Sequence, residues 1–242
     1  LLLVSGSSAL LTSNSRLQRG PRCPSQLSDS SSDGSRYEET SSAAKAVVSG
    51  LTSLLNVLFP QPMTQPRIYK KTRIRGSEIV DGIYEDFRRG YLFSGDIQAE
   101  IYSEDCVFTD PTLSFKGLST FERNIASIKP ALDAFLGDNA CILYSLSQDK
   151  ENRQIYTKWR MIGDIKLLPF WTPRLDLGGQ TTFTYERNGG GRINDYYEKW
   201  DISAGDALLQ LLGRSSLQSV HEIAKEETAT AKVVNYFSDT AK

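Results

Sequence analysis

The chain has 242 residues, with 28 Lys and Arg against 29 Asp and Glu, a net charge of -1 and a pI near 6.0. Proteins that bind nucleic acid usually carry an excess of Lys and Arg on one face, so we expect no nucleic-acid partner. No apolar run approaches the ~20 residues that a membrane-spanning helix needs, so we expect a soluble or peripheral protein.

The first residues have the composition of a targeting segment. Residues 1–28 are rich in Ser and Leu, contain Arg16, Arg19 and Arg22, and have no acidic residue before Asp29. This bias is typical of mitochondrial and chloroplast transit peptides. We therefore predict a transit peptide and a disordered Ser-rich segment over residues 1–42, the alternative being an ordinary disordered tail.

Residues 43–76 are predicted to hold an amphipathic helix and a Pro-rich basic linker. Apolar residues at helical spacing form one stripe: Val47, Val48, Leu51, Leu54, Leu55, Leu58 and Phe59. Three prolines between residues 60 and 66 predict an extended connector, and a basic run without acids follows it up to Arg75. The stripe is compatible with docking on the folded domain, with a partner, or with peripheral membrane contact through residues 45–75.

The remaining chain places helices before strands. We expect a helix from Ser77 to Gly90, a short helical stretch to Tyr102, a strand over 106–111, and a helix from Ser119 that Pro130 kinks or interrupts. From Asn139 the apolar period changes to two, which predicts antiparallel strands, the last two being 180–187 and 192–200. A short helix opens at Ser203, and residues 213–242 are predicted to form a partly helical C-terminal tail. This order indicates an α+β fold.

Three stretches of this region resemble the opening of nuclear transport factor 2-like, or SnoaL-like, domains. They are Ile83-Tyr84-Glu85-Asp86-Phe87, Gly95-Asp96, and Ile101-Tyr102-Ser103-Glu104-Asp105-Cys106-Val107-Phe108-Thr109-Asp110-Pro111. The stretches Lys158-Trp159-Arg160-Met161 and Glu198-Lys199-Trp200-Asp201-Ile202-Ser203 narrow the resemblance to an uncharacterised plant and cyanobacterial branch. The resemblance implies a cone-shaped domain over residues 77–212, with helices packed on a curved antiparallel sheet, and favours a chloroplast over a mitochondrial location.

The same resemblance implies a cavity between helices and sheet, which often receives hydrophobic small molecules. It does not imply one function, because the superfamily includes isomerases, cyclases, dehydratases, transport adaptors and dimerisation modules. The pocket-lining candidates are aromatic residues of the predicted helix and strands: Tyr84, Phe87, Phe108, Trp159, Phe183 and Trp200.

Residue types exclude several chemistries. The only histidine is His221, in the predicted tail, so we expect neither a histidine-built metal site nor a Ser-His-Asp or Cys-His nucleophile, and no cofactor. The three cysteines, Cys23, Cys106 and Cys141, are odd in number and widely spaced, which favours reduced thiols over a disulfide framework.

Acid/base chemistry needs fewer residues, and its weak candidates are Asp110 and Tyr102. Asp110 precedes a proline and is more simply explained as a strand-end or turn residue, and Tyr102 as a core aromatic with its hydroxyl at the rim. Trp159 and Arg160 alternate on one predicted strand, so they point to opposite faces.

We therefore weigh two functions. The first, which we favour, is a plastid domain that binds a hydrophobic small molecule or serves as an oligomerisation module, for example as a homodimer. The alternative is a cofactor-free isomerase, cyclase or dehydratase. An enzyme should show a cavity in which a carboxylate and a phenol converge.

Overall fold

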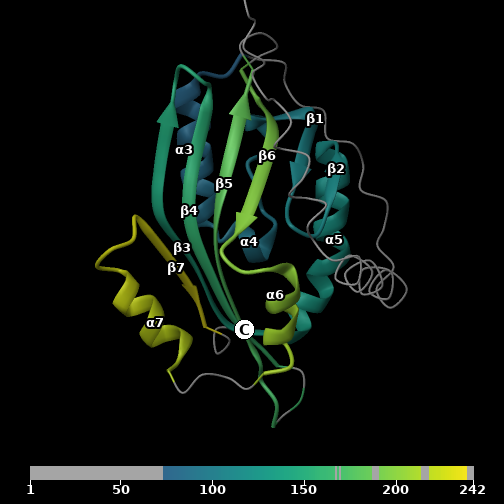
Figure 1. Ribbon diagram of the computed structural model, residues 1–242, viewed down its shortest axis with the longest axis vertical. Coiled ribbons are helices and arrows are strands. Elements are labelled where there is room, and N and C mark those ends of the chain that lie inside the picture. Colours follow the sequence, from purple (N-terminus) through teal and green to yellow (C-terminus); the bar gives the residue numbers. More distant parts are fainter. Residues whose placement is uncertain (1–72, 167, 169, 187–190, 214–217, 239–242) are drawn as a thin grey trace, which may run out of the picture.

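The computed structural model describes residues 73–238, apart from residues 167, 169, 187–190 and 214–217 (Figure 1). The helices are α3 (Gly76–Arg88), α4 (Tyr91–Ser94), α5 (Leu118–Phe135), α6 (Ala204–Gln210) and α7 (Val220–Glu227), with a 3-10 turn at Ala99–Ile101. The strands are β1 (Tyr102–Thr109), β2 (Ser114–Lys116), β3 (Leu136–Asp149), β4 (Gln154–Ile165), β5 (Arg174–Tyr185), β6 (Ile193–Trp200) and β7 (Val233–Phe237). The predicted transit peptide and amphipathic helix lie outside the described residues.

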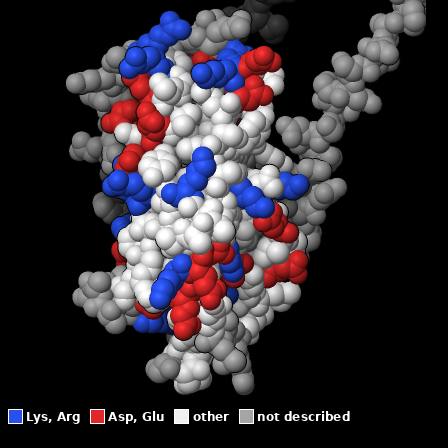
Figure 2. All heavy atoms as spheres, turned by 90° about the vertical axis from the view of Figure 1, so that its left-hand side faces the viewer, with Lys and Arg blue, Asp and Glu red and all other residues white. Residues whose placement is uncertain are grey.

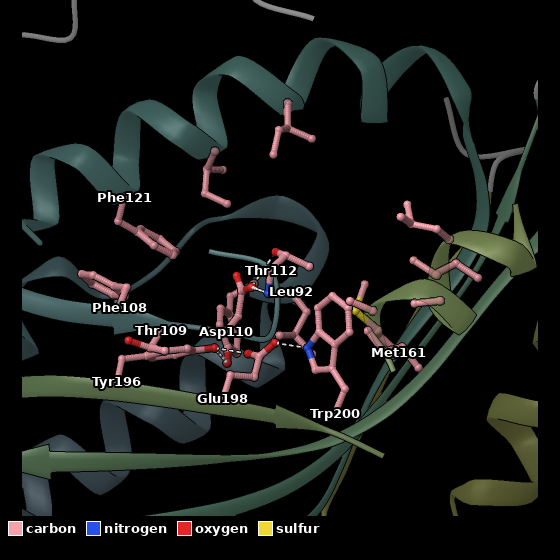
Figure 3. A pocket seen from close by; sticks show the side chains of 18 of the residues that line it. Leu92, Phe108, Thr109, Asp110, Thr112, Phe121, Met161, Tyr196, Glu198 and Trp200 are labelled. Atoms are coloured by element: carbon pink, nitrogen blue, oxygen red, sulfur yellow. Dashed lines mark hydrogen bonds between the residues drawn. The ribbon is translucent and has the colours of Figure 1, made fainter. Parts of the chain in front are cut away.

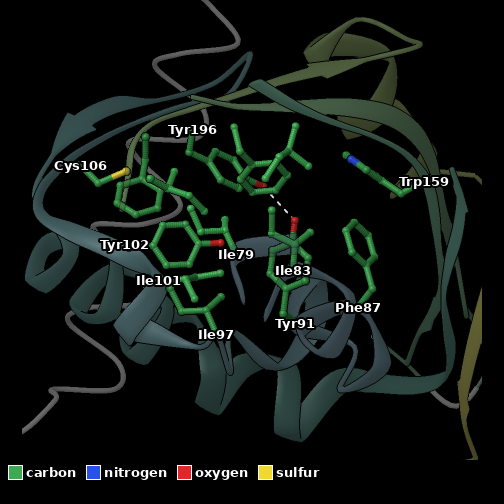
Figure 4. Packing of buried hydrophobic residues seen from close by; sticks show 14 of the residues in the cluster. Ile79, Ile83, Phe87, Tyr91, Ile97, Ile101, Tyr102, Cys106, Trp159 and Tyr196 are labelled. Atoms are coloured by element: carbon green, nitrogen blue, oxygen red, sulfur yellow. Dashed lines mark hydrogen bonds between the residues drawn. The ribbon is translucent and has the colours of Figure 1, made fainter. Parts of the chain in front are cut away.

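The seven strands form one sheet in the order β2-β1-β6-β5-β4-β3-β7. Strands β3 to β6 are antiparallel neighbours, which confirms the predicted meander. β1 pairs with β6 in parallel, a long-range pairing that the local pattern did not indicate. The sheet curves around the helices and the core (Figure 4), so the predicted α+β fold with helices on a curved sheet is confirmed.

Helix α3 lies against the inner face of the sheet because its apolar residues recur at four-residue intervals. Ile79, Ile83 and Phe87 are at most 1% exposed. The helix begins one residue before the expected Ser77: Arg75 is the N-cap, and its backbone N–H donates to the Glu78 carboxylate at 2.7 Å. Gly90, with φ of 65°, turns the chain into α4. Helix α5 continues through Pro130, so this proline does not end the helix.

Strand β4 shows the predicted alternation of inward and outward side chains. Ile155, Thr157 and Trp159 are at most 3% exposed, whereas Tyr156 on the opposite face is 39% exposed. The indole N–H of Trp159 donates to Thr181 Oγ1 at 2.9 Å, which satisfies its polar atom inside the core. The main core gathers such inward residues under α3 and α4 (Figure 4).

The predicted thiols are buried and reduced at Cys106 and Cys141, while Cys23 lies outside the described residues. Burial raises the pKa of the Cys141 thiol to about 12. Both thiols therefore behave as small apolar core residues.

Residues after 213 contribute to the sheet. β7 pairs antiparallel with β3, from Val233 opposite Leu143 to Phe237 opposite Asn139. Helix α7 covers the outer face, where Val220, Ile223 and Ala224 form a second core with β3 and β4. The domain limits of 77–212 stay a prediction, but part of the predicted tail belongs to this sheet.

Basic and acidic side chains are interspersed on the side of the molecule that carries β3, β7 and α7 (Figure 2). Among the described residues, none of the helices combines the length and apolar composition needed to cross a bilayer.

Candidate functional site

A cavity of about 420 Å³ lies between helices α5 and α6 and the inner face of the sheet (Figure 3). Helix α5 contributes Phe121, Ile125 and Ile128, helix α6 contributes Leu208, and Leu211 follows directly after α6. The sheet supplies further apolar side chains from β1, β4 and β5. The volume is within the range of small-molecule sites, and the walls are mostly hydrocarbon.

Polar groups gather at one end of this cavity, on strand β6. Tyr196, Glu198 and Trp200 lie two residues apart, so all three project from the same face of the strand. The Tyr196 hydroxyl donates a hydrogen bond to Glu198 Oε2, and Trp200 Nε1 donates to Glu198 Oε1 at 2.6 Å (Figure 3). The hydroxyl of Tyr91 lies 3.1 Å from that of Tyr196.

Asp110 adds a second carboxyl group to the same wall, just after β1 ends. Its Oδ1 accepts from the backbone N–H and hydroxyl of Thr112, both at 2.6 Å, and from the backbone N–H of Leu113 at 2.9 Å. Asp110 therefore forms the strand-end turn that its position before Pro111 suggested. Within the described chain, Oδ2 receives no hydrogen bond, so one oxygen is free of the turn.

Burial dominates the electrostatics of both carboxyl groups. Burial and, to a lesser extent, the nearby charge of Asp110 raise the pKa of Glu198, the hydrogen bonds from Tyr196 and Trp200 lower it, and the result is about 7. Loss of hydration also raises the pKa of Asp110, which the hydrogen bonds from Thr112 and Leu113 oppose. A carboxyl group that exchanges its proton near neutral pH thus faces an apolar cavity.

The structure separates the predicted pocket-lining residues into two groups. Phe108 and Trp200 line the cavity. Phe87, Trp159 and Phe183 lie in the main core instead, each at most 1% exposed. Tyr84 is partly buried and packs against that core. These four side chains pack in or against the main core between α3 and the sheet, so they do not border the cavity.

The two acid/base candidates also separate. Asp110 lines the cavity, whereas Tyr102 is 3% exposed in the core, with its ring 5.8 Å from that of Phe108. The phenol that accompanies a cavity carboxylate is Tyr196, and its partner is Glu198. Sequence reasoning missed both. The available signal was an acidic residue at an inward position of a strand, two residues from an aromatic on each side.

Trp159 and Arg160 project to opposite faces, as predicted. Arg160 forms a bidentate pair with Asp176, at 2.8 and 2.7 Å, and a further bond to Glu227 at 2.9 Å. Its guanidinium therefore holds α7 against the outer face of the sheet.

Among the described residues, no group of three His, Cys, Asp or Glu side chains is placed to hold a metal ion.

The site thus lies in a cavity between helices α5 and α6 and the inner face of a curved, largely antiparallel sheet. Residues 77–193 match the family model described as "Uncharacterized conserved protein (DUF2358)". The match covers just under half of the chain and runs from α3 to the first residue of β6. No curated protein matches the sequence.

Similar solved structures include proteins described as enzymes or putative enzymes and proteins without an assigned function. The pinacolase BvnE from Penicillium brevicompactum is 14% identical with a TM-score of 0.40, covering 58% of this chain and 93% of its own. IdmH, a putative polyketide cyclase from Streptomyces antibioticus, is 18% identical with a TM-score of 0.39, covering 58% and 99%. A hypothetical protein with a ketosteroid isomerase-like fold from Catenulispora acidiphila is 16% identical with a TM-score of 0.37, covering 55% and 91%. Likeness at this level carries no information about substrate or activity.

Proposed function

We propose that this domain binds a small hydrophobic molecule in the cavity between α5, α6 and the sheet. The observation that carries the proposal is the cavity itself, about 420 Å³ in volume and walled mainly by aliphatic and aromatic side chains. A molecule that fills it removes its own apolar surface from water and contacts Phe121, Ile125 and Leu208. The polar end beside Glu198 orients a ligand that carries one polar group.

A matched pair of variants on one helix tests this binding. Ala207 lines the cavity, so Ala207→Phe should fill part of it and weaken binding of an environment-sensitive hydrophobic dye at least tenfold. Leu209 lies on the outer side of the same helix and is 61% exposed, so Leu209→Phe should leave binding unchanged. Equal dye binding by both variants would show that the cavity is not the binding site.

Native mass spectrometry of protein from its source tissue, before and after organic extraction, should then reveal the bound molecule.

A second candidate is cofactor-free acid/base catalysis, which the Glu198–Tyr196 pair specifically favours. Glu198 has a pKa of about 7, so its carboxylate can take a proton from a substrate. Once Glu198 is protonated it no longer requires the hydrogen of the Tyr196 hydroxyl, which can then be donated to a developing oxyanion instead. In deuterated water, the protein should speed deuterium incorporation next to the carbonyl of hydrophobic ketones, and Glu198→Gln should abolish the effect. Rates unchanged by Glu198→Gln would exclude this chemistry.

The location of the protein in the cell and its oligomeric state are further proposals, which the sequence alone supports. Residues 1–28 contain three arginines and no acidic residue, a composition that supports import into a plastid or, alternatively, into a mitochondrion. A fluorescent fusion of residues 1–66 that stays in the cytosol would contradict organelle delivery. Native mass spectrometry also reports whether the protein is a homodimer, and flotation with vesicles tests membrane contact through residues 45–75.

A further inference from the structure

We propose that the ligand of this cavity is a hydrophobic organic cation, such as an aralkyl amine, whose ammonium group lies between Asp110 and Glu198. The inference rests on the proposed binding function and adds the charge of the ligand. It follows from the charges, the rings and the apolar walls of the cavity.

Among the described residues that line it, the cavity has two acidic groups and no basic one. Asp110 and Glu198 are the charged residues among those that line it, and no Lys, Arg or His is included. The donors that reach the two carboxyl groups are all neutral: Thr112, Leu113, Tyr196 and Trp200. Within the described part of the chain, neither carboxylate has an ion-pair partner.

Buried charges in proteins are normally paired, because an isolated carboxylate loses its hydration without compensation. Without a ligand, the site meets this cost by holding a proton near neutral pH. A ligand ammonium group offers another solution, since it supplies the missing positive charge and its N–H groups reach the oxygen that the Asp110 turn leaves free. An anionic ligand would instead add a third negative charge, so the site discriminates against carboxylates and phosphates.

Aromatic rings that line the same cavity also favour a cation. Phe108 lies close to two further rings that line the cavity, with centroids 4.6 Å from Phe121 and 5.6 Å from Phe115. Trp200 and Tyr196 add their rings at the polar end. The negative faces of such rings attract ammonium groups, and most strongly where water is excluded. The residues of α5 and α6 then accommodate the hydrocarbon part of the ligand.

The proposal predicts a coupling between binding and protonation. A cation binds the ionised form of the carboxyl pair, so its affinity should rise as pH rises through about 7, the pKa of Glu198 in the free protein. Below that value each pH unit should weaken binding by up to tenfold, because a proton must leave before the cation binds. A neutral ligand of the same shape should show no such dependence.

Isothermal titration of the full chain with phenethylamine and phenethyl alcohol tests the charge directly. The two probes share their shape, and the amine is charged at about pH 8 because alkylamines ionise like Lys. We expect the amine to bind at least tenfold tighter than the alcohol, with the difference shrinking as the pH is lowered to about 6. Glu198→Gln should remove this preference and leave alcohol binding in place. Glu226, in α7, is exposed, so Glu226→Gln should change neither the preference for the amine nor the affinity for the alcohol.

The outcomes separate the two proposals. Equal affinities for amine and alcohol, or tighter binding of the alcohol at about pH 8, would overturn the cation and leave the hydrophobic cavity standing. Failure of both probes to bind would overturn the cation together with the proposed binding function. If Glu198→Gln does not fold, the pH dependence of the native chain alone decides, because a pH-independent preference for the amine also overturns the role of the carboxyl pair.

Discussion

At the scale of single residues, two buried acids show that a raised pKa does not by itself mark a site. Burial raises the pKa of Asp86 to about 7, like that of Glu198. Asp86 accepts from the backbone N–H of Gln98 at 2.8 Å and from the Arg89 guanidinium at 2.6 Å, so it joins α3 to the chain that follows α4. Glu198 differs because it lines a cavity, and its donors among the described residues, Tyr196 and Trp200, are neutral.

Replacing Glu198 should change how stability depends on pH. Its pKa is about 7 in the folded protein against an ordinary pKa of 4.5 for a solvated Glu side chain, so between these values the native state binds more protons than the unfolded state. The free energy of unfolding therefore falls as pH rises through this window, by on the order of 3 kcal/mol from this group. Glu198→Gln should remove the contribution of this group to the pH dependence of the unfolding free energy, which urea denaturation at several pH values would measure.

Glu226→Gln is the matched control for this experiment, since Glu226 is exposed and the chemical change is the same. Its pH dependence should follow that of the native chain. A Glu198→Gln protein whose stability declines between pH 4.5 and 7 as steeply as the native one would show that Glu198 is already ionised there.

At the scale of elements, helix α6 replaces a missing strand at the edge of β5. Strand β6 ends at Trp200, opposite Gly179, and leaves the first residues of β5 without a neighbour on that side. The Gln210 side chain pairs with the backbone of Asp176 there, donating to its carbonyl and accepting from its N–H, both at 2.8 Å. This contact also holds α6 over the cavity.

Gln210→Ala should therefore destabilise the protein by about 1 to 2 kcal/mol, because two backbone groups of β5 lose their partner. It should also weaken ligand binding, since α6 forms one wall of the cavity. Leu209→Ala is the control: this side chain is 61% exposed, and its loss should cost less than about 0.5 kcal/mol. Equal unfolding midpoints for the two variants would refute the role of Gln210.

At the scale of the whole molecule, the sheet depends on residues near the end of the chain. β7 covers one edge of β3, and α7 covers Ala140, Ile142 and Ile162, which are fully buried. Arg160 adds its bond to Glu227 of α7. The outer face of β3 and β4 is thus apolar beneath α7 and requires that cover.

A chain that ends at residue 212 should consequently expose this face and either aggregate or unfold at a clearly lower temperature than the full chain. Circular dichroism melting with light scattering measures both effects. A chain that ends at residue 238 keeps α7 and β7 and serves as the control, with an unchanged midpoint. An unaltered, monomeric protein ending at 212 would show that residues 77–212 are sufficient.

The sequence by itself determined α3, β1, α5, α6 and the strands of the meander in their order, because apolar spacing of three and four or of two reports directly which residues face inward. It did not indicate β2 or the strand β7 in the predicted tail. The sequence also showed that the chain has a single histidine, and it predicted that the side chains of Trp159 and Arg160 point to opposite faces of their strand. Only the tertiary structure decided which inward residues border a void. Trp159, Phe183 and Trp200 all have aromatic side chains on strands, yet α3 and α4 fill the space under the first two, and α5 and α6 leave it open at Trp200. The proximity of Asp110 to Glu198 likewise arises from the parallel pairing of β1 with β6, a contact between distant segments that no local periodicity encodes.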